Sequence, residues 1–214
     1  MDFFILFTII EIVAILIVIS IHEFAHAWAA NYLGDPTAKI NGRLSLNPFA
    51  HLDLVGTLMF VFFKIGWGKP VPFNPNNLEN PRKGSALIAL AGPASNFFTA
   101  ILLALPLRLL TTSNVEALMP VAYLVGAIFN FSIVLMAFNL LPIPPLDGSK
   151  ILMLVLPKRM YQKYDQYLEG GMTYFIVFIL VDYFMLGRLF GFSIIGTVIG
   201  TVFDFFKYLI LLGT

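Results

Sequence analysis

The sequence predicts an all-α polytopic membrane protein, a bundle of about five to six transmembrane helices with a small membrane-associated β-ribbon after the first helix. Three observations predict this fold class. Hydrophobic residues make up 59% of the 214 residues, charged residues make up only 12%, and the mean hydropathy is +0.87. Soluble domains do not reach such values. The apolar residues also gather in long runs, as helices that cross a lipid bilayer require.

A transmembrane helix needs roughly 20 apolar residues, and five runs approach or exceed that length. These runs are 3–33, 85–110, 119–141, 170–187 and 191–213. A sixth run, 53–65, is shorter, and its sequence leaves open whether it crosses the membrane, re-enters it or lies at its surface. The sequence therefore predicts an integral membrane protein in direct contact with lipid.

The first run ends at a well-marked helix terminus. Gly34 can adopt the left-handed conformation that ends helices, and Pro36 cannot continue a helix. Beyond it, residues 37–40 and 43–46 flank Asn41-Gly42, the strongest two-residue hairpin signal that a sequence can carry. This pattern predicts that the stretch forms the β-ribbon.

Basic residues predict the orientation in the membrane. If the run at 53–65 does not cross, residues 34–84 carry six Lys or Arg, residues 142–169 carry four on the same side, and the opposite loop, 111–118, carries none. The positive-inside rule then places the basic loops in the cytoplasm and gives five crossings. A net charge of +1 without a continuous basic patch gives no reason to expect a nucleic-acid partner.

The first run contains an H-E-x-x-H motif, His22-Glu23-Phe24-Ala25-His26. Helical positions i and i+4 share a face, so His22 and His26 can offer two imidazole nitrogens to one tetrahedral Zn²⁺, with Glu23 beside it as a base. The chain has no cysteine, which excludes a thiolate zinc site. The motif predicts a hydrolytic zinc site inside a membrane helix. The alternative is a polar cluster without function.

A hydrolytic zinc site usually has three protein ligands, and two residues are candidates for the third. His51 follows Pro48 in a loop and has an equal claim to an interfacial or capping role. Asp147 follows the run 119–141, where prolines break the helix and Gly148 permits close approach of backbone. With five crossings Asp147 lies on the same side as the histidines, whereas six crossings would separate them. The sequence favours Asp147.

The motifs in combination resemble the site-2 protease family of intramembrane zinc metalloproteases. They are the H-E-x-x-H motif in a membrane helix, the stretch Ala91-Gly92-Pro93-Ala94-Ser95-Asn96 in a later one, and the stretch from Asn139 to Gly148 that reads N-x-x-P-x-P-x-L-D-G. Their spacing fits the compact prokaryotic branch. The resemblance covers about 15–150, and helices at about 170–213 would be accessory to it within a single domain, 1–214. We expect no PDZ or CBS domain.

The resemblance implies a function and a set of site residues. His22, His26 and Asp147 would be the zinc ligands, Glu23 the catalytic base, and Asn139 a residue near the substrate or the developing oxyanion. Substrates would be single-pass or other transmembrane proteins, cleaved within the bilayer by regulated intramembrane proteolysis. The enzyme would lie in a prokaryotic plasma membrane with its active site toward the cytoplasm.

Two further expectations follow from the same motifs. An exposed edge of the β-ribbon could hold an unwound substrate by strand addition. Asn96 would bridge helices through hydrogen bonds, and Gly92 and Pro93 would permit close packing and a bend.

Two other functions compete with proteolysis. A transporter would also place ionisable residues and broken helices in a membrane, but no similarity between the halves of the chain indicates an internal repeat. A catalytically inactive metal-binding scaffold would need the ligands alone, and the position of Glu23 disfavours it.

Overall fold

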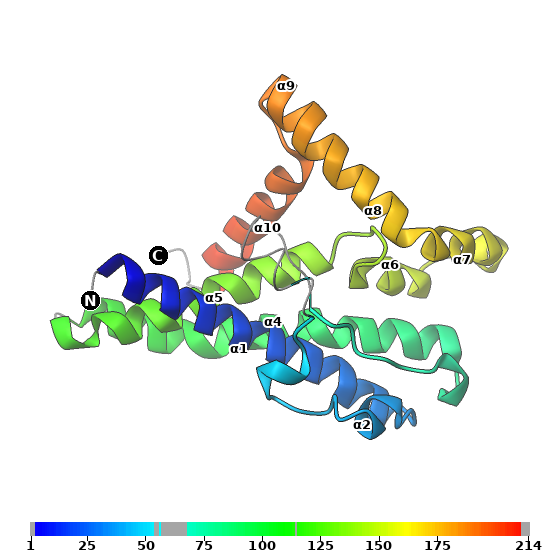
Figure 1. Cartoon of the computed structure of the whole chain (residues 1–214), viewed down its shortest axis with the longest axis horizontal. Coiled ribbons are helices and arrows are strands. Elements are labelled where there is room, and N and C mark those ends of the chain that lie inside the picture. The colour runs from blue at the N-terminus through cyan, green and yellow to red at the C-terminus, as the bar shows by residue number, and fades with distance from the viewer. Residues whose placement is uncertain (1–2, 54–55, 57–67, 114, 211–214) are drawn as a thin grey trace.

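The computed structural model describes residues 3–53, 56, 68–113 and 115–210, and these residues are mainly helical (Figure 1). The run predicted at 53–65 lies outside them except at 53 and 56. The α-helices are α1 (Phe3–Tyr32), α2 (Thr37–Ile40), α4 (Pro81–Thr112), α5 (Met119–Asn139), α6 (Asp147–Ile151), α7 (Tyr161–Glu169), α8 (Gly171–Leu180), α9 (Arg188–Phe190) and α10 (Ile194–Ile210). The 3₁₀ turns are η1 (Pro48–Ala50), η2 (Pro75–Asn77), η3 (Glu116–Leu118), η4 (Leu152–Leu154) and η5 (Lys158–Met160), and η6 (Val181–Gly187) is a π-helix.

Four described segments are long and apolar enough to cross a membrane. They are Phe4–Tyr32, Pro81–Thr112, Glu116–Asn139 and Gly171–Phe190. Each coincides with one predicted run, so the protein is an integral membrane protein. The fifth run, 191–213, contains α10, of which 17 residues are described, and the residues after Ile210 lie outside the described part of the chain. The predicted count of five to six crossings is therefore not confirmed.

The predicted end of the first helix is confirmed. Gly34 has a φ of +101°. The amide of Asp35 donates to the carbonyl of Ala30 at 2.9 Å, and the amide of Gly34 donates to that of Asn31 at 3.3 Å. These two bonds form a Schellman motif, which pairs carbonyls that the end of a helix leaves without partners.

The predicted β-ribbon is wrong. Thr37–Ile40 is the helix α2, and Asn41-Gly42 terminates it. Gly42 has a φ of +67°, its amide bonds to the carbonyl of Lys39 at 3.0 Å, and the amide of Arg43 bonds to that of Ala38 at 2.9 Å. A hairpin turn and a Schellman motif both need positive φ, so Asn-Gly suits either. The strand edge expected to receive substrate is absent from this stretch.

Helices α1, α4 and α5 form the centre of the molecule. All three pack against one another, and the colour order in Figure 1 shows that α1 and α5 run in one direction while α4 returns in the other. Small buried residues on α1 and α4, among them Ala27, Ala30 and Ala86, allow close helix approach. Because α1 and α5 run the same way, their C-terminal halves lie at the same end of the bundle.

A buried carboxylate joins the end of α1 to the loop before α4. Asp35 has no exposed surface and accepts hydrogen bonds from the amides of Thr37 and Asn74 and from the side-chain amide of Asn77, at 3.1, 2.6 and 2.7 Å. Burial raises the pKa of Asp35, but hydrogen bonds to its ionised form, first from the Thr37 hydroxyl and then from Asn77 and the two backbone amides, outweigh it and hold the pKa below its ordinary value. The Asp35 network fixes the loop that leads into α4.

Candidate metal centre

Three side chains from two distant segments meet at the C-terminal halves of α1 and α5. His22 and His26 lie one turn apart on α1, and their Nε2 atoms are 3.0 Å from each other. The Oδ2 atom of Asp147, the first residue of α6, lies 3.2 Å from each Nε2. One ligand atom from each residue lies within 4.8 Å of the others. The structure therefore brings together the three side chains selected from the sequence, whose role as ligands stays a prediction.

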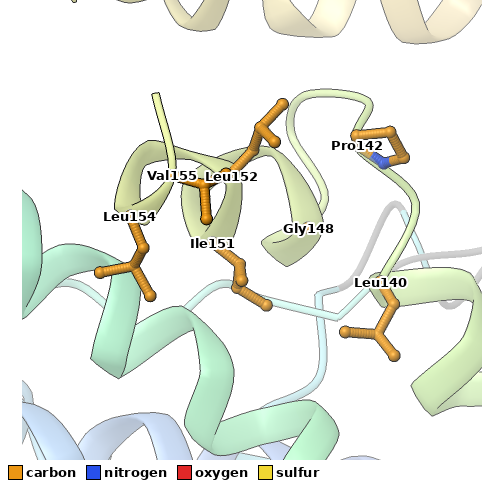
Figure 2. A pocket seen from close by; sticks show the side chains of 7 residues that line it. All are labelled: Leu140, Pro142, Gly148, Ile151, Leu152, Leu154 and Val155. Atoms are coloured by element: carbon orange, nitrogen blue, oxygen red, sulfur yellow. The ribbon is translucent and has the colours of Figure 1, made fainter. Parts of the chain in front are cut away.

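Gly148 makes the position of Asp147 possible. A Cβ atom at Gly148 would lie 2.3 Å from the carbonyl oxygen of Leu140 and 2.4 Å from that of Leu141. Only glycine permits the chain that leaves α5 to fold back this tightly, and Figure 2 shows Gly148 in α6 beyond Leu140. The expectation that Gly148 allows close backbone approach is confirmed.

Two tyrosines of α7 bond to the segment 140–149, which leads from α5 into α6 and which we call the Asp147 turn. The Tyr164 hydroxyl donates to the carbonyl of Ser149 at 2.6 Å, and the Tyr167 hydroxyl donates to that of Pro142 at 3.1 Å. Burial raises the pKa of Tyr164 to about 12, with a smaller contribution from Tyr167, so its hydroxyl stays protonated as a donor. The sequence reasoning missed this support, because no local pattern connects α7 to the Asp147 turn.

Gly92 of α4 leaves the space in which both imidazoles lie. A Cβ atom there would stand 2.4 Å from Nε2 of His26, 2.5 Å from its Cε1 and 2.6 Å from Cε1 of His22. Real Cβ contacts essentially never fall below 3.0 Å. The sequence interpretation of Gly92 as a close-packing position is correct, and the surface it packs against is the histidine pair.

The outer ring nitrogens of both histidines contact α4. The Nδ1–H of His26 donates to the carbonyl of Ile88 at 2.7 Å, and Nδ1 of His22 lies 3.0 Å from Nδ2 of Asn96. Asn96 therefore bridges two helices, as expected, and its partner is a member of the cluster. Such contacts to the outer nitrogen orient histidines at metal sites.

The donor set fits a zinc ion. Two imidazole nitrogens and one carboxylate oxygen match the ligands of hydrolytic zinc sites, and a tetrahedral zinc with bonds of about 2.0–2.1 Å separates neighbouring ligand atoms by about 3.3 Å. The observed separations are 3.0 and 3.2 Å. The three side chains are 5%, 9% and 13% exposed, and Oδ2 of Asp147 has no hydrogen-bond donor among the described residues apart from these imidazoles. An ion would satisfy this buried oxygen.

The imidazoles also set the charge state of Asp147. Burial raises the pKa of its carboxyl group, but the two adjacent histidines, His26 above all, outweigh that effect and hold the pKa below its ordinary value. Asp147 is consequently ionised at neutral pH, which is the state in which a carboxylate binds a metal.

Glu23 and Asn139, the other two predicted site residues, have no hydrogen bond to the three clustered side chains among the described residues. Glu23 follows His22 on α1, and its buried Oε2 has no hydrogen-bond partner in the described part of the chain. Asn139, the last residue of α5, donates from Nδ2 to the carbonyl of Leu135 at 3.1 Å, and no described hydrogen bond joins it to the cluster.

His51, the alternative third ligand, is buried but is not a member of the cluster. Its Nε2–H donates to the carbonyl of Ser45 at 2.7 Å, and its Nδ1 lies 3.5 Å from Nη2 of Arg43. Both ring nitrogens thus have partners in the chain, and His51 is a structural residue of the loop after α2.

Comparison with known proteins matches residues 106–182 to the family model described as Peptidase family M50. This segment includes Asn139 and Asp147 but not the H-E-x-x-H motif. A Bacillus subtilis protein named "Putative zinc metalloprotease YwhC" is 37% identical over 172 residues, which cover 78% of each chain. Proteins named "Putative zinc metalloprotease Rip2" are 32% identical over 140 residues in Mycobacterium tuberculosis and over 134 residues in Mycolicibacterium smegmatis. The match to the Mycobacterium tuberculosis protein covers 62% of this chain and 52% of the relative, and the match to the Mycolicibacterium smegmatis protein covers 60% and 50%. The chain thus spans about half the length of these mycobacterial relatives. No solved structure matches the chain.

Proposed function

Because this chain belongs to peptidase family M50, we propose that it is a zinc-dependent intramembrane endopeptidase that cleaves transmembrane segments of other membrane proteins. Membership in this family confirms the resemblance to site-2 proteases that the three motifs carry, and it makes the chain a metalloprotease. The finer statements are our proposal: the ligand set, the roles of individual residues, the substrates and the side of the membrane.

The cluster of His22, His26 and Asp147 carries the proposal. It unites two imidazoles and an ionised carboxylate, nearly buried, between helices that cross the membrane. These residues would hold the zinc, which when bound supplies Lewis acidity toward the peptide carbonyl and toward the attacking water. Polar groups of this kind are costly within a membrane unless they have such a use.

Glu23 would move the protons of the reaction. Its Oε2 atom is buried and has no hydrogen-bond partner among the described residues, so it is available to accept a proton from the attacking water and to pass it to the leaving amine. Asn139 would bind the substrate near the scissile carbonyl. One N–H of its side-chain amide is bonded to the carbonyl of Leu135 at 3.1 Å, and the amide has a second N–H and an Oδ1 atom to offer to a substrate.

An apolar hollow of about 290 Å³ beside the Asp147 turn would receive a substrate side chain (Figure 2). Besides Gly148, its lining residues are Leu140, Pro142, Ile151, Leu152, Leu154 and Val155. An apolar lining suits the side chains that a membrane-spanning substrate offers next to its cleavage site.

The charge pattern supports a cytoplasmic active site in a prokaryotic plasma membrane. Basic residues accompany the elements at the cluster end of the bundle, among them Lys39 in α2, Arg82 and Lys83 at the start of α4, and Lys150 in α6. The positive-inside rule assigns this end to the cytoplasm.

Purified protein in liposomes with a tagged single-pass substrate tests the proposal. We expect cleavage that a zinc chelator stops, and Glu23→Gln should retain zinc while its rate falls about 10²–10⁴-fold. Glu116→Gln, at an exposed glutamate of η3, is the matched control and should cleave normally. An inactive scaffold would bind zinc without cleavage in the wild type, and a transporter would move ions without cleavage. Equal rates in Glu23→Gln and wild type would refute the role of Glu23.

A further inference from the structure

The two histidines of the cluster differ in how firmly their tautomers are fixed. A backbone carbonyl only accepts hydrogen bonds, so the contact of His26 Nδ1 with the Ile88 oxygen at 2.7 Å places the proton on Nδ1. The Nε2 atom of His26, which faces His22 and Asp147, then has a free lone pair for a metal. Nothing else is required of His26.

His22 faces an amide in place of a carbonyl. Its Nδ1 lies 3.0 Å from Nδ2 of Asn96, a residue with no exposed surface whose Oδ1 is buried without a partner in the described chain. If Nδ2–H donates to Nδ1, the neutral His22 ring carries its proton on Nε2. That nitrogen is 3.2 Å from Asp147 Oδ2 and could not bind a metal in this form.

The orientation of the amide decides the tautomer. The two ends of an asparagine amide have nearly the same shape, so a half turn about the last side-chain bond exchanges Oδ1 and Nδ2 without moving another atom. Oδ1 then accepts from Nδ1–H of His22. The amide has one partner and one open atom in either orientation, so the amide's own contacts do not choose between the two. A zinc ion bound to Nε2 of His22 selects the orientation with Oδ1 toward the ring, because zinc binding to Nε2 requires the proton to lie on Nδ1.

We propose that Asn96 is a positioning residue of the zinc site, whose Oδ1 accepts a hydrogen bond from Nδ1–H of His22 and holds that ring in its metal-binding tautomer. The inference rests on the proposed function, since it assumes a zinc ion between His22, His26 and Asp147. Helix α4 thereby orients both rings: Ile88 orients His26 through backbone, and Asn96 orients His22 through a side chain.

The alternative is that Asn96 only bridges α4 and α1, with Nδ2 as donor. Two substitutions separate these roles. Asn96→Asp keeps the shape and, when ionised, offers oxygen acceptors only, whereas Asn96→Leu keeps the volume and offers neither donor nor acceptor. The acceptor role predicts that Asn96→Asp binds zinc as tightly as the wild type and that Asn96→Leu binds about 10- to 100-fold more weakly. The donor role favours the tautomer that cannot bind zinc, so it predicts that neither variant binds zinc more weakly than the wild type. A bridge that matters only for packing α4 against α1 predicts equal weakening in both variants.

The test measures the zinc dissociation constant of the purified full-length protein by competition with a chromophoric chelator. Thr99→Val is the matched control, because Thr99 lies about one turn further along α4 and its hydroxyl bonds to the carbonyl of Ser95 at 2.8 Å, within its own helix. It should bind zinc normally. Wild-type affinity in Asn96→Leu, or equal weakening in both Asn96 variants, would overturn the inference. Absence of zinc binding by the wild type would instead overturn the proposed function.

A second measurement reads the ring protonation in the wild type and needs neither Asn96 variant. The chain has three histidines, so selective ¹⁵N labelling of histidine gives few ring-nitrogen signals. In the zinc-loaded wild type we expect a protonated Nδ1 in His22, identified by the loss of its signals in His22→Gln. A His22 whose Nδ1 carries no proton in the zinc-loaded protein would refute the assignment.

Discussion

Gly92→Ala adds one methyl group to α4 and tests whether the space beside the two imidazoles is needed by the metal. The new Cβ would lie 2.4 Å from His26 Nε2 and 2.6 Å from His22 Cε1. Ordinary van der Waals contact begins near 3.4 Å, so the His26 nitrogen must move by about 1 Å. Zinc–ligand distances tolerate about 0.2 Å. We therefore expect the site to lose its ligand geometry.

The size of the effect follows from the energy of overpacking. Such insertions cost roughly 1–3 kcal/mol, which corresponds to a zinc affinity about 5- to 150-fold lower, and proteolysis should fall in parallel. The metal-free protein should be little affected, because the histidines can move away and alanine favours a helix interior over glycine by about 1 kcal/mol.

Zinc competition and thermal unfolding of purified Gly92→Ala measure these two quantities separately. Gly126→Ala in α5 is the matched control, since its Cβ would meet only Leu107 Cδ1 at an ordinary 3.5 Å. It should bind zinc with wild-type affinity. If Gly92→Ala also binds zinc with wild-type affinity, the imidazoles are not held against Gly92 as the structure shows, and the reasoning fails.

Three further predictions concern the surroundings of the site. Tyr164→Phe removes the bond to the Ser149 carbonyl, so thermal denaturation should show stability lower by about 0.5–1.5 kcal/mol, more than Tyr167→Phe loses at its more exposed bond. The pKa of Asp35 is lowered in the folded protein, so its contribution is present above the unfolded pKa and is lost as pH falls through the folded one. Asp35→Asn should therefore lower stability at neutral pH by about 1–3 kcal/mol and flatten its acid dependence, whereas Glu79→Gln, exposed in the same loop, should do neither. His51→Gln should leave zinc stoichiometry unchanged while lowering the unfolding temperature, and loss of zinc in this variant would reinstate His51 as a ligand.

The membrane-spanning helices were the most predictable part of the fold. Their apolar runs are required by the surrounding lipid and can be recognised without knowledge of the tertiary structure. Gly34 and Pro36 specify the end of α1 through local backbone conformation. The β-ribbon failed because Asn41-Gly42 supplies a positive φ that serves two different structures. Only the packing of α2 and its neighbours decides between them, and that lies outside a local sequence window.

The candidate site divides in the same way. The H-E-x-x-H spacing places His22 and His26 on one face of any helix, and the direction of α5 relative to α1 brings Asp147 to them. The contact of Gly92 with the imidazoles and of Asn96 with His22 depends on the rotation of α4 about its axis, which neither hydropathy nor spacing specifies. The sequence identified the stretch 91–96, which contains both residues, as a motif, but it did not predict that this stretch contacts the two imidazoles. The role of Tyr164 left no local signal at all.

X-ray absorption at the zinc edge tests most directly whether two imidazoles and Asp147 share one zinc ion. For the purified wild type we predict one zinc per chain, with two imidazole nitrogens and oxygen ligands at about 2.0–2.2 Å. Asp147→Ala should lose most of the metal under the same conditions. A wild-type protein without zinc, or an Asp147→Ala variant with full zinc content and an unchanged spectrum, would contradict the account.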